Sequence, residues 1–156
     1  MNAPGTRQIR LLVVDNQPAV RRGLKMRLAL EPDLDVVGEA CDADEAVPLA
    51  RALRPDVILM DFEMPGMSGI AATEGLRTVA PHSAVVIFTL RDDAATREQA
   101  RAAGAAAFVA KHRTEEVLLA AIRGAALAHG KQGRHDRASA RGEEEHTDDM
   151  REYRGS

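Results

Sequence analysis

Short apolar segments alternate with longer amphipathic segments along most of this chain. Five of the apolar segments are rich in Val, Ile, Leu and Ala and short enough to be strands buried on both faces. The predicted strands are Ile9 to Val14, Leu34 to Ala40, Val57 to Met60, Ala84 to Phe88 and Ala106 to Ala110.

The segments between these strands predict helices. In the first of them, Val20, Leu24 and Leu28 recur near helical spacing among basic residues, which is typical of an amphipathic surface helix. The predicted helices run from Val20 to Leu30, Asp42 to Arg54, Ser68 to about Ala80, Asp93 to Ala103 and Thr114 to about Ala128. Gly104 and Gly130 are placed to end the last two of these helices.

Pro48 leaves the start of the second helix open between two positions. If Asp44 is the cap, the proline falls near the first turn, where a missing N–H does little harm. If Asp42 is the cap, Pro48 lies further inside the helix and is expected to bend it.

Five strands alternating with five helices predict an α/β fold with one parallel sheet, right-handed crossovers and helices on both faces. A chain of 156 residues has the length of one domain. We expect residues 1–7 to be an N-terminal extension, residues 8–129 to form the domain, and residues 130–156 to be a polar, disordered tail. That tail is too short to hold a helix-turn-helix domain with a core of its own.

Composition and charge limit the classes of partner and the cellular compartment that we expect for this protein. A net charge of −3 gives no electrostatic reason to expect binding to nucleic acid or to an anionic membrane. No apolar run approaches the roughly 18 residues of a membrane-spanning helix, and the first residues lack the layout of a signal peptide. With a single cysteine, Cys41, no intrachain disulfide can form. We therefore expect a soluble, cytoplasmic protein.

Four predicted strands lead into a polar residue of useful chemistry. Asp15, Asp61 and Lys111 follow the first, third and fifth strands, and Thr89 follows the fourth. In an open parallel sheet, ligands bind outside the carboxyl ends of the strands, where the winding direction switches. A single polar residue at a strand end is common, but four of complementary chemistry predict one site.

These side chains suit phosphoryl transfer to the protein. Two carboxylates, Asp15 and Asp61, form a site for a hard cation such as Mg²⁺. A carboxylate can also accept a phosphoryl group when nearby cations neutralise the transferring oxygens. Lys111 supplies a cation and Thr89 supplies a hydroxyl donor.

The motifs that carry these residues resemble the receiver domain of two-component signalling over about residues 8–128. They are Val13-Val14-Asp15-Asn16, Leu59-Met60-Asp61-Phe62-Glu63-Met64-Pro65-Gly66-Met67-Ser68-Gly69, Phe88-Thr89 and Lys111. The resemblance implies a flavodoxin-like (βα)5 sandwich with strand order 2-1-3-4-5. Arg22-Gly23 and Val37-Gly38-Glu39-Ala40 are similar to the NarL/LuxR-type branch of these regulators.

The resemblance also implies roles for the residues at the strand ends. Asp61 would accept a phosphoryl group from a histidine kinase or a phosphotransfer protein. Asp15, Asn16, Asp61 and the backbone carbonyl of Glu63 would hold Mg²⁺.

The other roles concern the response to phosphorylation. Thr89 and Lys111 would bind the phosphoryl group, and Phe108 matches the position of the aromatic switch residue. The alternative for Phe108, a packed strand aromatic with no switching role, is equally compatible with the sequence. A downstream protein would read the resulting change, and the resemblance allows a homodimer through the switch face.

Asn16 and Leu90 depart from the family pattern, and Glu63 bears on the same site. Asn16 stands where a second acidic residue is usual, so we expect weaker binding of Mg²⁺. Leu90 stands where a small residue is usual, and its bulk is expected to narrow access to Asp61. Glu63 either adds negative charge near the metal or is a solvated loop carboxylate.

The same residues give less support to several other functions. Asn16 and Leu90 motivate a pseudo-receiver, an interaction module that works without phosphorylation. A second alternative is a NarL/LuxR-type transcription regulator without its helix-turn-helix domain. An enzyme of the haloacid dehalogenase type would normally have Asp where Glu63 stands, and a flavin site would need a Gly- or Ser-rich loop after the first strand. We therefore predict a non-enzymatic protein.

Overall fold

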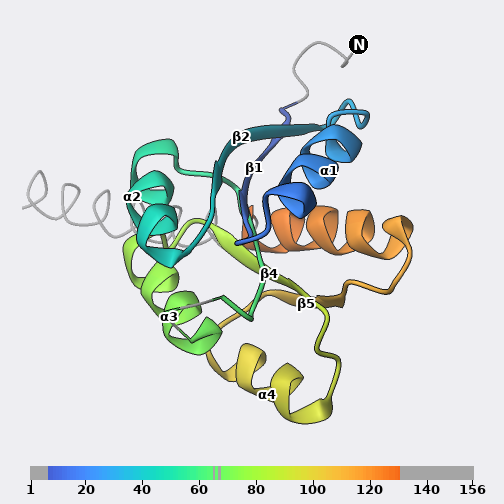
Figure 1. Cartoon of the computed structure of the whole chain (residues 1–156). Helices are drawn as coiled ribbons and strands as arrows, with labels where there is room; N and C mark the ends of the chain where they lie inside the picture. The colour runs from blue at the N-terminus through green and yellow to red at the C-terminus, as the bar shows by residue number, and fades with distance from the viewer. Residues whose placement is uncertain (1–6, 65, 67, 131–156) are drawn as a thin grey trace, which may run out of the picture.

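A five-stranded parallel sheet forms the centre of the protein, in a computed structural model that describes residues 7–64, 66 and 68–130. The strand order is β2-β1-β3-β4-β5, which confirms the predicted doubly wound topology (Figure 1). The strands are β1 (Ile9–Val14), β2 (Leu34–Ala40), β3 (Val57–Met60), β4 (Ala84–Thr89) and β5 (Ala107–Ala110).

Helices cover both faces of this sheet. They are α1 (Pro18–Leu28), α2 (Ala43–Leu53), α3 (Gly69–Val79), α4 (Ala94–Ala102) and a further helix over residues 115–130, here called helix 115–130. Helix α1 and helix 115–130 lie on one face, and α2, α3 and α4 lie on the other (Figure 1). The two layers follow from the right-handed crossovers that join parallel strands.

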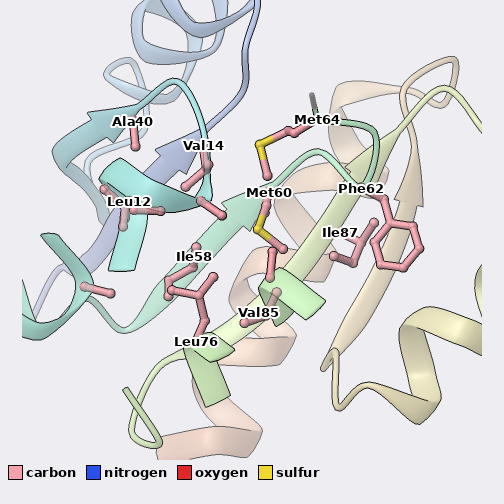
Figure 2. Close-up of a cluster of buried hydrophobic side chains, with 14 of the residues drawn as sticks. Leu12, Val14, Ala40, Ile58, Met60, Phe62, Met64, Leu76, Val85 and Ile87 are labelled. Carbon is pink, nitrogen blue, oxygen red and sulfur yellow. The ribbon is translucent and has the colours of Figure 1, made fainter. Parts of the chain in front are cut away.

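Alternate strand residues supply two separate cores, because successive side chains point to opposite faces of a sheet. On the α2, α3 and α4 face, Leu12, Ile58 and Met60 pack with Leu76 and with alanines of the helices (Figure 2). The residues between them face α1 and helix 115–130, with Leu28 and Ile122 fully buried.

Most of the predicted ends agree with the structure to within two residues. Helix α1 begins and ends two residues earlier than predicted, and Thr89 is the last residue of β4, not the residue after it. Helix α2 is capped by Asp42, whose side chain accepts a 2.9 Å bond from the Glu45 N–H, so Pro48 lies inside the helix. Gly104, with φ of 102°, ends α4 as expected. Gly130 is still helical, so the last helix does not end at Ala128. Strand β5 begins at Ala107, one residue later than the predicted start at Ala106. The expected tail, beyond residue 130, and most of the expected N-terminal extension lie outside the described residues.

Asp56 ties together the amino-terminal ends of three strands. Its carboxylate accepts a 2.8 Å bond from the Arg10 N–H, and its own N–H donates to the Arg10 carbonyl at 2.8 Å. The Ala84 N–H donates to the Asp56 carbonyl at 2.9 Å. The buried Ser83 hydroxyl donates to the Pro55 carbonyl at 2.6 Å, which adds a fourth bond at this edge.

Gly69, the first residue of α3, lies against the loop that follows β3. A methyl group on Gly69 would lie 2.5 Å from the Phe62 carbonyl oxygen and would also overlap the Phe62 ring. We expect Gly69→Ala to lower the free energy of unfolding by about 2 kcal/mol, because the loop must shift to make room. Urea denaturation measures this change.

Gly75→Ala is the matched control in the same helix. A methyl group on Gly75 meets nothing within 4 Å. Because alanine has the higher helix propensity, this change should raise stability by about 0.5 to 1 kcal/mol. Equal effects of the two substitutions would contradict the proposed overlap at Gly69.

Candidate functional site

The four residues predicted from the strand ends meet at the carboxyl edge of the sheet. Main-chain hydrogen bonds fix three of them in place: the Asp15 N–H bonds the Ala40 carbonyl at 3.1 Å, and the Asp61 N–H bonds the Val14 carbonyl at 3.1 Å. The Lys111 N–H donates to the Thr89 carbonyl at 2.7 Å. The parallel register therefore brings residues from β1, β3, β4 and β5 to one crevice.

Lys111 joins the two carboxylates of this crevice. Its Nζ donates to Asp15 Oδ2 at 2.8 Å and to Asp61 Oδ2 at 3.0 Å. Asp15 is 2% exposed and Asp61 is 8% exposed, so this charge pairing occurs largely out of water. Burial opposes the charged lysine, but the hydrogen bonds that its ammonium donates to Asp15 and Asp61 outweigh burial and raise the pKa of Lys111 above its ordinary value.

The second oxygen of each carboxylate accepts a bond from the backbone two residues later. Asp15 Oδ1 accepts from the Gln17 N–H at 2.9 Å, and Asp61 Oδ1 accepts from the Glu63 N–H at 3.0 Å. Such local turns are usual for aspartate at the start of a loop. Both carboxylates are therefore held in fixed orientations, and each oxygen keeps a lone pair for a further ligand.

The structure places the other predicted residues at different depths. Thr89 is fully buried, and its Oγ1 accepts a 3.5 Å bond from the Arg91 N–H. Asn16 and Glu63 are exposed in the loops beside the two aspartates. Phe108 is half-buried, packs against the core of the α2, α3 and α4 face, and has the Arg97 guanidinium 5.0 Å from its ring centre.

The sequence model of the response regulator receiver domain family matches residues 11–123. The chain belongs to this family. In receiver domains generally, phosphorylation of an aspartate is the signalling event, and these domains are typically signalling proteins rather than enzymes.

Relatives of this receiver domain are regulators of the NarL/LuxR type. The transcriptional regulatory protein YxjL of Bacillus subtilis is 38% identical over 119 residues, which are 76% of this chain and 55% of YxjL. The nitrate/nitrite response regulator NarL of Escherichia coli is 34% identical over 74% of this chain and 54% of its own length. This chain spans about half the length of the curated relatives it matches.

The solved structures agree with the fold. A two-component response regulator of the LuxR family from Aurantimonas sp. SI85-9A1 superposes with a TM-score of 0.74 at 35% identity, covering 78% of this chain and 86% of that one. The receiver domain of CheB from Thermotoga maritima gives a TM-score of 0.71 at 37% identity, covering 77% and 97%. Within the described part of this receiver, no helix is both long and apolar enough to cross a bilayer.

Three residues that the strand-end pattern did not identify also shape the receiver site. The Arg21 guanidinium of α1 donates to the Asp15 main-chain carbonyl at 2.5 Å. The Phe88 ring lies beside the ammonium of Lys111, 5.8 Å from its centre to Nζ. Arg91 pairs with Glu63 at 3.4 Å, which links the loops after β3 and β4 across the mouth of the site. The position of Arg21, six residues after Asp15 and three after the first residue of α1, is a sequence signal that could have identified it.

The donor set of this receiver fits a hard divalent cation. Within residues 7–64, 66 and 68–130, no three side chains of His, Cys, Asp or Glu are grouped as metal ligands. Two carboxylates that share one ammonium nevertheless leave an excess of negative charge in the crevice. Mg²⁺ is commonly held by one or two carboxylates with waters completing its octahedron, so Asp15 and Asp61 are sufficient as protein carboxylate ligands.

Proposed function

We propose that Asp61 of this receiver accepts a phosphoryl group from the phosphohistidine of a histidine kinase or phosphotransfer protein. The observation that supports it is the bridge from Lys111 Nζ to the Asp15 and Asp61 carboxylates. In the step, an Asp61 oxygen forms a bond to phosphorus while the phosphorus bond to the donor imidazole breaks. The imidazole leaves with the bond's electron pair and takes up a proton.

The surrounding residues would stabilise the charge that moves during this step. Lys111, released from Asp61, donates to a phosphoryl oxygen, and the Thr89 hydroxyl donates to another. Bound Mg²⁺ would neutralise phosphoryl oxygens, held by Asp15, Asp61, the Glu63 main-chain carbonyl and the amide oxygen of Asn16.

The output of this step is a change in protein binding. Repositioning of Thr89 and Lys111 towards the phosphoryl group alters the ends of β4 and β5, and Phe108 on β5 moves between two packings as the switch residue. A downstream protein, or a second copy of the chain, reads the face made by α4, β5 and helix 115–130. Residues 8–129 act as the receiver, in the cytoplasm, without direct contact to nucleic acid or membrane.

The experiment that tests this proposal is intact-mass measurement after incubation with acetyl phosphate, with Mg²⁺ and with EDTA. We expect an adduct of one phosphoryl group that forms only with the metal. Borohydride reduces an aspartyl phosphate to homoserine, and peptide mapping should place that homoserine at residue 61. A homoserine at another aspartate, or no adduct where a standard receiver is labelled, would overturn the proposed role of Asp61.

A pseudo-receiver that binds its partner without phosphorylation is the second candidate. It is favoured by Asn16, which provides a neutral amide beside the two carboxylates. Leu90 gives less support, because its side chain is 67% exposed, and the narrowing of access to Asp61 stays a prediction.

Asn16→Asp tests how much the missing charge matters. The added carboxylate lies in the loop after Asp15, so we expect Mg²⁺ to bind about tenfold more tightly, because another anionic oxygen donor favours a hard cation. Isothermal titration calorimetry measures the affinity. Asp92→Asn is the control. The Asp92 carboxylate lies outside the crevice and pairs with Arg97, so this change should leave the affinity for Mg²⁺ unchanged. Unchanged affinity in Asn16→Asp would show that charge at residue 16 does not limit metal binding.

A further inference from the structure

The outer side of α1 carries a basic recess that the receiver site does not use. The helix contains Arg21, Arg22, Lys25 and Arg27 and no acidic residue. A depression of about 310 Å³ lies on this side, and its lining residues are Pro18, Arg21, Arg22, Lys25, Met26 and Glu39. We call this depression the α1 recess.

The charges of the α1 recess are incompletely neutralised. Glu39 pairs with Lys25 and with Arg21, the second at 3.4 Å, so one carboxylate serves two cations. The exposed guanidinium of Arg22 pairs with no carboxylate in the described part of the chain. The recess therefore presents about two uncompensated positive charges to solvent.

The same chain carries an acidic block of opposite charge. Glu143-Glu144-Glu145 and Asp148-Asp149 place five carboxylates within seven residues, and no Lys or Arg lies between Gly142 and Met150. Several carboxylates that are close in sequence repel one another, and a nearby cationic surface relieves that repulsion.

The acidic block follows a helix that begins beside α1. Helix 115–130 begins beside α1, where Arg27 Nε donates to Glu115 at 2.5 Å, and both helices cover the same face of the sheet (Figure 1). A return from residue 130 to residue 115 covers about 22 Å at about 1.5 Å per residue. The thirteen residue steps from position 130 to Glu143 span up to about 43 Å when extended, about twice the length of the return to residue 115.

We propose that residues 143–149 dock in cis on the α1 recess. Tethering gives the acidic block a high effective concentration at the recess, so a few exposed ion pairs are sufficient for occupancy. The recess adjoins the receiver site, because Arg21 contacts both Glu39 and the main-chain carbonyl of Asp15. The docked block covers the surface beside the mouth of the site and competes with any protein phosphodonor that approaches along α1.

Zero-length carbodiimide cross-linking of the full chain tests this docking, because the chain contains only three lysines. Lys25 lies in the recess, Lys111 is largely buried, and Lys131 precedes the acidic block. Trypsin would release a docked cross-link as residues 23–27 joined to residues 142–151. The Lys25 to Glu39 cross-link, which joins residues 23–27 to 28–51, is the internal positive control.

Three comparisons make the outcome decisive. We expect the Lys25 to acidic-block cross-link to form within single molecules, as shown by mixing ¹⁴N- and ¹⁵N-labelled protein. Its yield should fall about threefold in Arg22→Gln, the effect of one exposed ion pair, and should rise in Glu39→Gln. It should also fall at high salt, because exposed charges are screened. Cross-links from residues 142–151 to Lys131 alone, or to Lys25 only between different molecules, would overturn the proposal.

Discussion

An Asp61→Ala variant should take up no phosphoryl group from acetyl phosphate under conditions that label the wild-type protein. Asp61 directly follows β3, and its carboxylate accepts a hydrogen bond from the Lys111 ammonium. Its Oδ1 is held by the Glu63 N–H at 3.0 Å, which fixes the direction in which the nucleophile faces. Intact mass with and without Mg²⁺ measures the loss.

Asp92→Ala is the control for this variant. Asp92 lies in the loop after β4 with a side chain 28% exposed, paired with Arg97, and we expect it to leave labelling unchanged. Asp61→Ala itself should remain folded, because Lys111 keeps its 2.8 Å bond to Asp15 and one carboxylate then matches one ammonium. A metal-dependent adduct that persists in a folded Asp61→Ala protein would contradict the proposed function.

Lys111→Met should lower the free energy of unfolding by about 3 kcal/mol at pH 7 without Mg²⁺. The substitution leaves Asp15 and Asp61, which are 2% and 8% exposed, without their shared cation. Removing one partner of a largely buried ion pair strands the remaining charges in a poorly solvated place. Mg²⁺ should recover part of the loss because it replaces the missing positive charge, and urea denaturation measures both effects.

The pH dependence of this contribution has a definite sign. Although burial opposes it, bonding to the two aspartates raises the pKa of Lys111 above the ordinary 10.5. The protonated lysine therefore contributes its full stabilisation below about pH 10.5, and that contribution is lost as the pH rises through the higher pKa of the folded protein.

Lys25→Met is the matched control for the lysine. Lys25 pairs with Glu39 on the surface, and its side chain is 47% exposed. Exposed ion pairs contribute little, so this variant should differ from the wild type by less than about 0.5 kcal/mol. If the two variants were equally stable, Lys111 would not be the neutralising group of the crevice.

The strands and the convergence of their ends could be predicted from local pattern. Each strand is a short aliphatic run, and parallel pairing places all carboxyl ends on one edge, so Asp15, Asp61, Thr89 and Lys111 follow from the sequence. Their position depends on topology alone and needs no knowledge of side-chain conformation.

Contacts between distant loops could not be predicted in this way. The pair between Arg91 and Glu63 joins two loops whose spacing depends on how each turn is built, and neither residue has a periodic signal. The place of Pro48 within α2 could not be predicted for a similar reason. Asp42 and Asp44 are both good caps, and the choice between them depends on the packing of Ala43 and Ala46 in the core. Gly130 illustrates the opposite case, in which a residue that favours helix ends is still helical.

The two edges of the sheet differ in what joins their strands. At the amino edge, Asp56 links β1, β3 and β4 through hydrogen bonds to the main chain of Arg10 and Ala84. At the carboxyl edge, the ammonium of Lys111, shared by two aspartates, links the ends of β1, β3 and β5. Main-chain hydrogen bonds hold the strands at both edges, so exchange of a ligand at the carboxyl edge would change this side-chain link and leave the pairing of the strands in place.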